Sequence, residues 1–195
     1  MGSEMCIRDS YMYDLKKWEN NLVEDIGSKR FKHSKRVMEA ALKLNKNVDD
    51  DLVKTAAILH DCAKYNEDKY LKLFAANISS ETINYKSVLH SFLGAEVAKK
   101  VYNIDNDQVL DAIRYHTTGK ENMSELEKII YLADAIEPER SYPGVDELRD
   151  LAKKDIDQAV LSSLSHNIIF LTNKQCLIHP LTISAYNYLI KEKNE

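Results

Sequence analysis

Glycine, proline and cysteine are all scarce in this chain of 195 residues, which contains five glycines, three prolines and three cysteines. So few turn-forming residues, beside 44% hydrophobic and 30% charged residues, argue against a turn-rich β fold and favour helices. Cys6, Cys62 and Cys176 are odd in number and lack CxxC spacing, which argues against a disulfide scaffold. Such cysteines are typical of free thiols in a reducing cytosol.

The chain also lacks a long apolar run and a long basic run. No apolar stretch approaches the roughly 20 residues of a membrane-spanning helix, and no signal-peptide core is present. The net charge is −4, so we expect no nucleic acid partner. These absences predict a cytoplasmic protein without a membrane partner. The sequence does not fix the oligomeric state, and a homodimer is one option.

The first ten residues differ from the rest of the chain. Residues 1–10, MGSEMCIRDS, have no apolar period, and part of them reads like a translated sequencing adapter. We therefore treat them as an artefact or a tail. Residues 11–195 contain no repeat, low-complexity stretch or Pro/Ser-rich linker, and their number suits a single domain with its own core.

Apolar residues recur at helical spacing along residues 11–195 and predict an all-α helical bundle. Gly27 is suited to a left-handed C-terminal cap, Ser124 with Glu127 forms a capping box, and Gly94 would allow a close approach. The expected helices cover 13–26, 29–46, a third from Asp49–Asp51 to Ala63, 87–102, a fifth from Asp105 or Asn106 to His116, a sixth from Ser124 to Pro138, and at least two more within 145–171 and 181–191.

His60 and Asp61 are adjacent inside the apolar run 58–64, a pairing that packing alone explains poorly. Four other imidazole or carboxylate side chains fall on the inward faces of further predicted helices: His33, His90, His116 and Asp134. A single inward histidine is usually a core residue. Burying six such groups without compensation costs several kcal/mol each, and a metal site compensates them together.

Imidazoles and carboxylates without thiolates suit iron, manganese, cobalt or zinc. Six ligands exceed one tetrahedral ion, whereas two ions bridged by Asp61 would use the full set. Such a pair, about 3.5–4 Å apart, generates a metal-bound hydroxide at neutral pH and stabilises an attacked phosphorus centre. The pattern therefore indicates hydrolysis of a phosphate ester or anhydride.

The series His33, His60-Asp61, Asp134 resembles the signature of the HD-domain metal-dependent phosphohydrolases, and His90 with His116 matches their two-metal form. Further segments between about residues 30 and 189 resemble the YqeK family: 89–95, 116–119, 123–124, 131–140 and 179–187. The resemblance implies an HD-domain helical bundle and the activity of a symmetrical bis(5'-nucleosyl)-tetraphosphatase, which cleaves diadenosine tetraphosphate to two ADP. It also implies an iron-type centre with the ligands His33, His60, Asp61, His90, His116 and Asp134.

Residues near the six ligands are expected to contact the substrate or take part in catalysis. Lys64 lies one helical turn after His60 and Arg140 follows Pro138, so both can reach phosphate oxygens, although each is also explained as a surface residue. The expected catalytic groups are Asp61, Lys64 and Asp134, and of these Asp134 is expected to accept a proton. Three residues directly after His116 are expected to hold phosphate or ribose oxygens: Thr117, Thr118 and Gly119. A plain helix C-terminal turn explains Gly119 equally well.

Some alternatives stay open at this point. The alternative substrates are a nucleoside monophosphate, a nucleoside diphosphate and a cyclic nucleotide, and the alternative to an enzyme is a non-catalytic nucleotide sensor. We expect His166 to be structural or exposed, and His179 is a weaker option for a substrate contact. Cys62 follows the His-Asp pair but lies off the ligand set.

Overall fold

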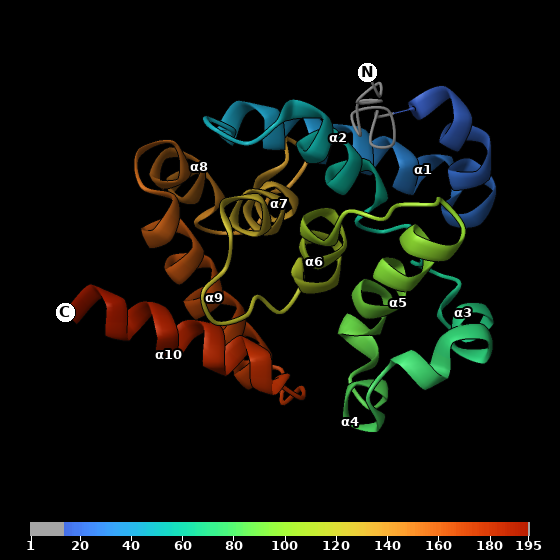
Figure 1. Ribbon diagram of the computed structural model, residues 1–195. Coiled ribbons are helices and arrows are strands. Elements are labelled where there is room, and N and C mark those ends of the chain that lie inside the picture. The colour runs from blue at the N-terminus through green and yellow to red at the C-terminus, as the bar shows by residue number, and fades with distance from the viewer. Residues whose placement is uncertain (1–13, 195) are drawn as a thin grey trace, which may run out of the picture.

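The structure is a computed structural model that describes residues 14–194. Within these residues the chain is helical and contains no strand, which confirms the all-α fold class. The elements are α1 (Leu15–Leu44), α2 (Asp50–Leu59), α3 (Glu67–Phe74), the 3-10 helix η2 (Ala75–Asn77), α4 (Ser80–Ile83), α5 (Lys86–Lys100), α6 (Asp107–Tyr115), α7 (Glu125–Ile136), α8 (Val145–Lys154), α9 (Ile156–Asn173) and α10 (Pro180–Asn194) (Figure 1). The expected artefact at residues 1–10 and Cys6 lie outside the described residues.

Helix α7 forms the centre of the packing and contacts α1, α2, α6, α8 and α9. Four of its apolar side chains are fully buried: Ile129, Ile130, Leu132 and Ala133. The expected capping box is confirmed, since Ser124 N–H donates to Glu127 Oε2 at 2.6 Å and Glu127 N–H donates to Ser124 Oγ at 3.3 Å. This cap sets where α7 begins and thus places Asp134 in its last turns.

The break expected at Gly27 is confirmed, and helical structure resumes directly after it within α1. Gly27 has φ 78° and ψ 154°, a region that is essentially restricted to glycine. Its ψ is extended, so it does not form the left-handed cap that we expected. Helix α1 packs against α2 and α7, and the segment after the break places His33 Nε2 3.0 Å from Asp134 Oδ1 and 3.8 Å from Asp61 Oδ2.

Gly94 on α5 allows the close approach that the sequence predicts. A Cβ atom there would lie 3.3 Å from Ile113 Cγ2 and 3.4 Å from the carbonyl oxygen of His60. The Cys62 thiol donates to the Gly94 carbonyl oxygen at 3.3 Å. Helix α5 can therefore lie directly against the segment that holds the His60-Asp61 pair.

One expected bound needs correction, and the structure adds elements that the sequence did not indicate. The third helix does not extend to Ala63: α2 ends at Leu59, and the chain continues in turns with short-range bonds such as Cys62 N–H to Leu59 O at 3.0 Å. The region between the third and fourth expected helices holds α3, η2 and α4, which no clear pattern announced. Asp155 separates α8 from α9, because its extended backbone ends one helix and its carboxylate caps the next.

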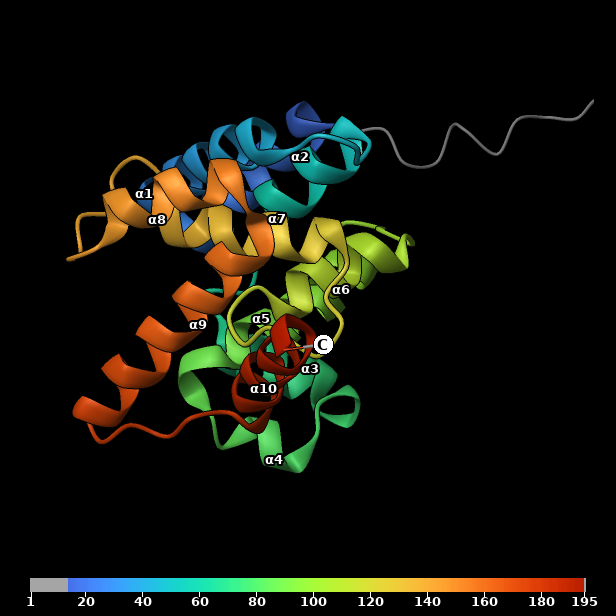
Figure 2. The same ribbon diagram turned by 90° about the vertical axis from the view of Figure 1, so that its left-hand side faces the viewer.

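Figure 2 shows α1, α2, α7 and α8 in one layer and α4, α5 and α10 on the other side of the molecule, with α9 running between the two. Helix α9 packs against α7, α8 and α10. Among residues 14–194, no helix is both long enough and apolar enough to cross a membrane.

Replacing Gly27 with alanine tests the break in α1. The Gly27→Ala protein should lose about 1–3 kcal/mol of unfolding free energy, because alanine is strained at this φ and ψ although no atom lies within 4 Å of the added Cβ. Urea denaturation measures the change, with Ser28→Ala at the exposed neighbouring position as control. Equal stability of both variants would contradict the strained backbone.

Candidate functional site

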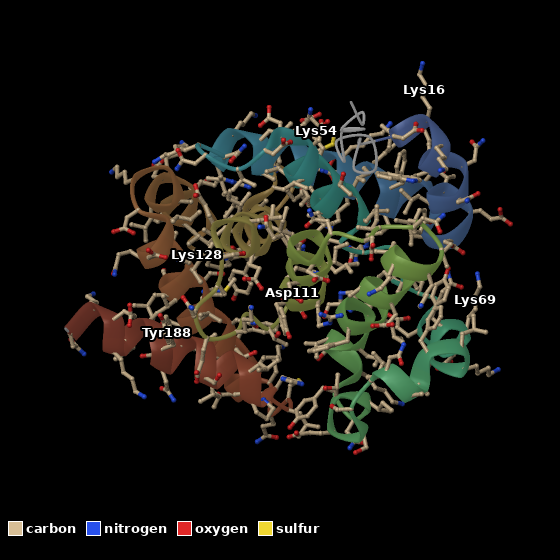
Figure 3. The ribbon with its side chains drawn as sticks, viewed as in Figure 1. Lys16, Lys54, Lys69, Asp111, Lys128 and Tyr188 are labelled. Atoms are coloured by element: carbon tan, nitrogen blue, oxygen red, sulfur yellow. The ribbon has the colours of Figure 1, made fainter. Side chains whose placement is uncertain are left out.

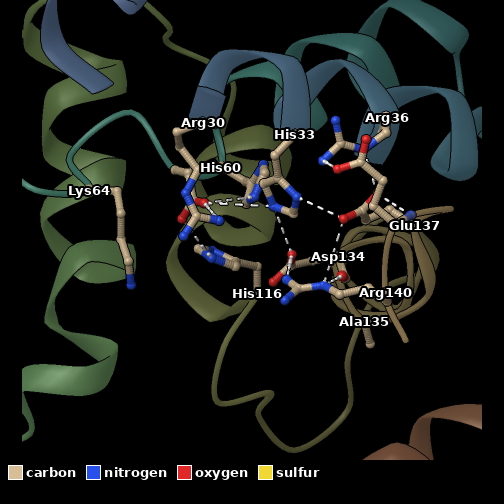
Figure 4. A network of polar contacts seen from close by, with 12 residues as sticks. Arg30, His33, Arg36, His60, Lys64, His116, Asp134, Ala135, Glu137 and Arg140 are labelled. Atoms are coloured by element: carbon tan, nitrogen blue, oxygen red, sulfur yellow. Dashed lines mark hydrogen bonds and ion pairs between the residues drawn. The ribbon is translucent and has the colours of Figure 1, made fainter. Parts of the chain in front are cut away.

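The structure brings together all six side chains that the sequence singled out. Their ligand atoms form three overlapping groups, within each of which the atoms lie no more than 4.8 Å apart. The groups are His33–His60–Asp61, His60–His116–Asp134 and Asp61–His90–His116. The residues come from α1, the turn after α2, α5, the end of α6 and α7, so only the tertiary fold assembles them (Figure 4).

Asp61 occupies the centre of this cluster and is 3% exposed. Its Oδ2 atom lies 3.3 Å from His60 Nε2 and 3.8 Å from His33 Nε2. Its Oδ1 atom lies 3.3 Å from His90 Nε2 and 3.7 Å from His116 Nε2. Each carboxylate oxygen therefore faces a different pair of imidazoles, which is the arrangement that a carboxylate bridging two ions requires.

The tautomers of His60 and His116 are set by the backbone. The Nδ1 atoms of His60 and His116 lie 2.7 Å from the carbonyl oxygens of Ala57 and Ile113, and a carbonyl only accepts. Both Nδ1 atoms therefore carry a proton, and in the neutral form of each ring Nε2 offers a lone pair. These buried Nε2 atoms have no hydrogen-bond partner among the described residues. Buried lone pairs that converge in this way fit a bound metal ion.

His33 is oriented by residues that the sequence analysis missed. Its Nδ1 donates to Glu137 Oε1 at 3.2 Å, and Arg36 Nε donates to Glu137 Oε2 at 2.7 Å (Figure 4). Burial would raise the pKa of Glu137, but Arg36 lowers this pKa below its usual value. The spacing in the sequence could have indicated that this pair lies near the ligands, since Arg36 lies one turn after His33 and Glu137 lies three residues after Asp134.

Both carboxylates of the cluster are held in the ionised form. Burial would raise the pKa of Asp61, yet the neighbouring imidazoles of His60, His116 and His90 hold this pKa well below its usual range. Burial opposes ionisation of Asp134 too, and His33, His60 and Arg140 lower its pKa despite that. Two carboxylates without protons, one buried and one half-buried, offer only acceptor oxygens, which is the state that a cation requires.

Three cations approach the cluster. Arg140 Nη2 lies 2.5 Å from Asp134 Oδ1, and its Nε donates to the Asp134 carbonyl at 2.8 Å. Lys64 Nζ lies 3.0 Å from His90 Nδ1. Arg30, which the sequence analysis did not single out, places Nη1 3.0 Å from Asp61 Oδ2. The cluster thus has positive groups at its edge, where an anionic substrate would enter.

A pocket of about 470 Å³ opens beside the cluster and is lined by His116 and Asp134 of the cluster and by Arg140, which contacts Asp134. Thr117 also lines this pocket, and its hydroxyl shares a hydrogen bond of 2.9 Å with Ser91. The Thr118 hydroxyl is buried and donates to the Gly119 carbonyl at 2.9 Å. Of the three residues after His116, only Thr117 lines the pocket.

Two other features lie away from the six side chains. A smaller pocket of about 270 Å³ is lined by residues of α7, α9 and α10, among them Lys128 and Tyr188 (Figure 3). His179 is buried elsewhere: its Nδ1 accepts from the Leu181 N–H at 3.2 Å and its ring stacks on Phe92 at 5.4 Å. These contacts give His179 a role in anchoring the start of α10.

The chain matches the family model described as HD domain over residues 30–139. It is 41% identical to the symmetrical bis(5'-nucleosyl)-tetraphosphatase of Halalkalibacterium halodurans, over 84% of this chain and 90% of that protein. It is 37% identical to the protein of the same name from Bacillus subtilis, over 83% and 89%. A crystal structure described as a predicted HD superfamily hydrolase involved in NAD metabolism, from Clostridium acetobutylicum, matches with TM-score 0.87 and 42% identity, over 93% of this chain and 99% of that one.

The Glu137→Gln protein tests whether Glu137 positions His33. Loss of the carboxylate should weaken Mn²⁺ binding about 10–100-fold, because a partner that orients a metal-binding imidazole contributes that much. Calorimetric titration of Mn²⁺ into the metal-free protein measures the affinity. Glu139→Gln is the matched control, since the Glu139 side chain is 69% exposed and contacts Arg36 but not His33. Equal affinities of the two variants would contradict the positioning role.

Proposed function

The chain belongs to the HD-domain family and, within it, to the symmetrical bis(5'-nucleosyl)-tetraphosphatases, and on this basis we propose that it hydrolyses dinucleoside tetraphosphates such as diadenosine tetraphosphate to two nucleoside diphosphates. The observation that carries the proposal is Asp61, whose two oxygens face separate pairs of imidazoles. The names of the relatives supply the substrate class, and the cationic edge of the cluster suits a polyphosphate.

We propose that two metal ions are held by the six clustered side chains: His33, His60, Asp61, His90, His116 and Asp134. Iron is the expected metal, with manganese, cobalt and zinc as alternatives, since imidazole and carboxylate accept all four. When bound, the ions lower the pKa of a water molecule and polarise the attacked phosphate. Asp61 holds the two halves of the ligand set together, and Glu137 keeps His33 in place.

Arg140 and Lys64 are proposed to bind the phosphate chain. A guanidinium can hold two phosphate oxygens at once, and Arg140 lies at the junction of the cluster and the pocket. Lys64 lies against His90, within reach of the same region. The proposed role of Asp134 as a proton acceptor is less favoured, because His33 and Arg140 stabilise its ionised form. Of the residues after His116, Thr117 is the one that we retain as a substrate contact.

The alternatives are a phosphatase that acts on nucleoside mono- or diphosphates and a non-catalytic nucleotide sensor. No contact in the structure favours either one over the tetraphosphatase. Four expectations stay predictions: a single domain over residues 11–195, a homodimer, a cytoplasmic location and the absence of a nucleic acid partner.

Product analysis tests the proposed function. The metal-loaded protein incubated with diadenosine tetraphosphate should yield ADP alone, because attack between the second and third phosphates gives two identical halves. Chromatographic separation of the nucleotides measures this. The His60→Ala protein should lose turnover while it keeps its helical circular dichroism spectrum. ATP plus AMP as products, or no turnover by the wild-type protein, would overturn the proposal.

A further inference from the structure

We infer that the pocket beside Asp134 is a nucleoside subsite, in which one base of the substrate stacks on the rings of Tyr142 and His166 while the Asn167 amide hydrogen-bonds to the edge of that base. The inference deepens the proposed function and rests on it for the identity of the substrate. It gives a role to His166, which the sequence predicts only as a structural or exposed residue.

The pocket joins two different environments. Part of its lining is His116, Asp134 and Arg140, which belong to the cluster or contact it. The rest of its lining includes residues of α9 and of the loop after α7, among them Tyr142, His166, Asn167 and Phe170. The volume of about 470 Å³ lies within the usual range for a small-molecule site. A nucleotide needs the same two kinds of surroundings, one for its phosphates and one for its aromatic base.

Tyr142 and His166 form an aromatic surface within the pocket lining. Their ring centroids lie 5.2 Å apart, with 37° between the planes. The Tyr142 hydroxyl donates to the Ala135 carbonyl at 2.9 Å, which ties the ring to the end of α7. Phe170 lies one turn after His166 on α9 and is 52% exposed. Exposed aromatic rings at a pocket wall provide π-faces for a base, and such stacking tolerates any base.

Asn167 adds a polar group to the pocket lining that holds Tyr142 and His166. Its side chain is half-buried and lines the pocket, and its amide has no hydrogen-bond partner within residues 14–194. A carboxamide offers both donors and an acceptor. Adenine presents this complementary pair on its N6 and N7 edge. A half-buried amide that lacks a partner and lies beside aromatic rings is therefore suited to a base.

The smaller pocket lined by α7, α9 and α10 also holds an aromatic ring and an amide, but the Tyr188 hydroxyl donates to the Asn122 amide oxygen at 3.4 Å, so these two groups already contact each other. Its lysines already have partners: Lys128 Nζ lies 2.6 Å from Asp157 Oδ1, and Lys193 Nζ donates to Gln158 Oε1 at 3.2 Å. It also lacks any of the six clustered side chains. A nucleotide bound there would not place its phosphates at the cluster.

Two alanine variants of the metal-loaded protein test the subsite: His166→Ala and Asn167→Ala. His166→Ala should raise KM for diadenosine tetraphosphate and the calorimetric Kd for ADP by about tenfold, since stacking of one base contributes ~1–3 kcal/mol. Asn167→Ala should raise both values as well. The inhibition constant of pyrophosphate, which lacks a base, should not change. Asn173→Ala, an exposed position on the same helix outside the pocket, is the matched control.

The readouts separate the subsite from the proposed function. Wild-type affinity for ADP in both pocket variants would overturn the subsite, and so would an equal loss of ADP and pyrophosphate binding. If the wild-type protein binds ADP through the pocket but does not cleave diadenosine tetraphosphate, the proposed function fails and the subsite stands. His166 is exposed, so its replacement should leave the fold intact, and circular dichroism checks both variants.

Discussion

The buried carboxylate of Asp61 is the constraint on which the rest of the site depends. A carboxylate that is 3% exposed costs several kcal/mol unless positive or polar groups compensate it. Its compensation comes from four imidazoles and from Arg30, which places Nη1 3.0 Å away. These groups lie on α1, on α5, at the end of α6 and in the turn after α2. The Asp61 carboxylate is therefore compensated only when these elements pack together.

Backbone features explain how helices of ordinary composition reach this carboxylate. Gly94 removes the side chain that would separate α5 from the carbonyl of His60. Gly27 permits α1 to change direction before Arg30 and His33. Behind His33, the contacts of Arg36 with Glu137 fix one imidazole that faces Asp61. The site is thus held by a second layer of backbone and charged contacts, which restricts the orientation of each ligand atom.

Much of this arrangement could be predicted from the sequence, because helical periodicity identifies which face of a helix is buried. That face held His33, His90 and His116, and local signals located the break at Gly27 and the start of α7. The end of α2 at Leu59 was not predictable, since apolar residues continue through Ala63 and only the tertiary fold turns the chain there. Arg30 was missed because a charged residue on a long helix is usually solvated. The pocket depends on how α9 packs beside the loop after α7, which no spacing within either element encodes.

Under the proposed function, Asp61 would contact two metal ions, one at each of its oxygens. Anomalous diffraction from crystals grown with manganese tests it most directly, because the signal locates each metal without assumptions about its ligands. We expect two peaks within the cluster, each next to a different oxygen of Asp61. A single peak, or two peaks of which neither contacts Asp61, would contradict it.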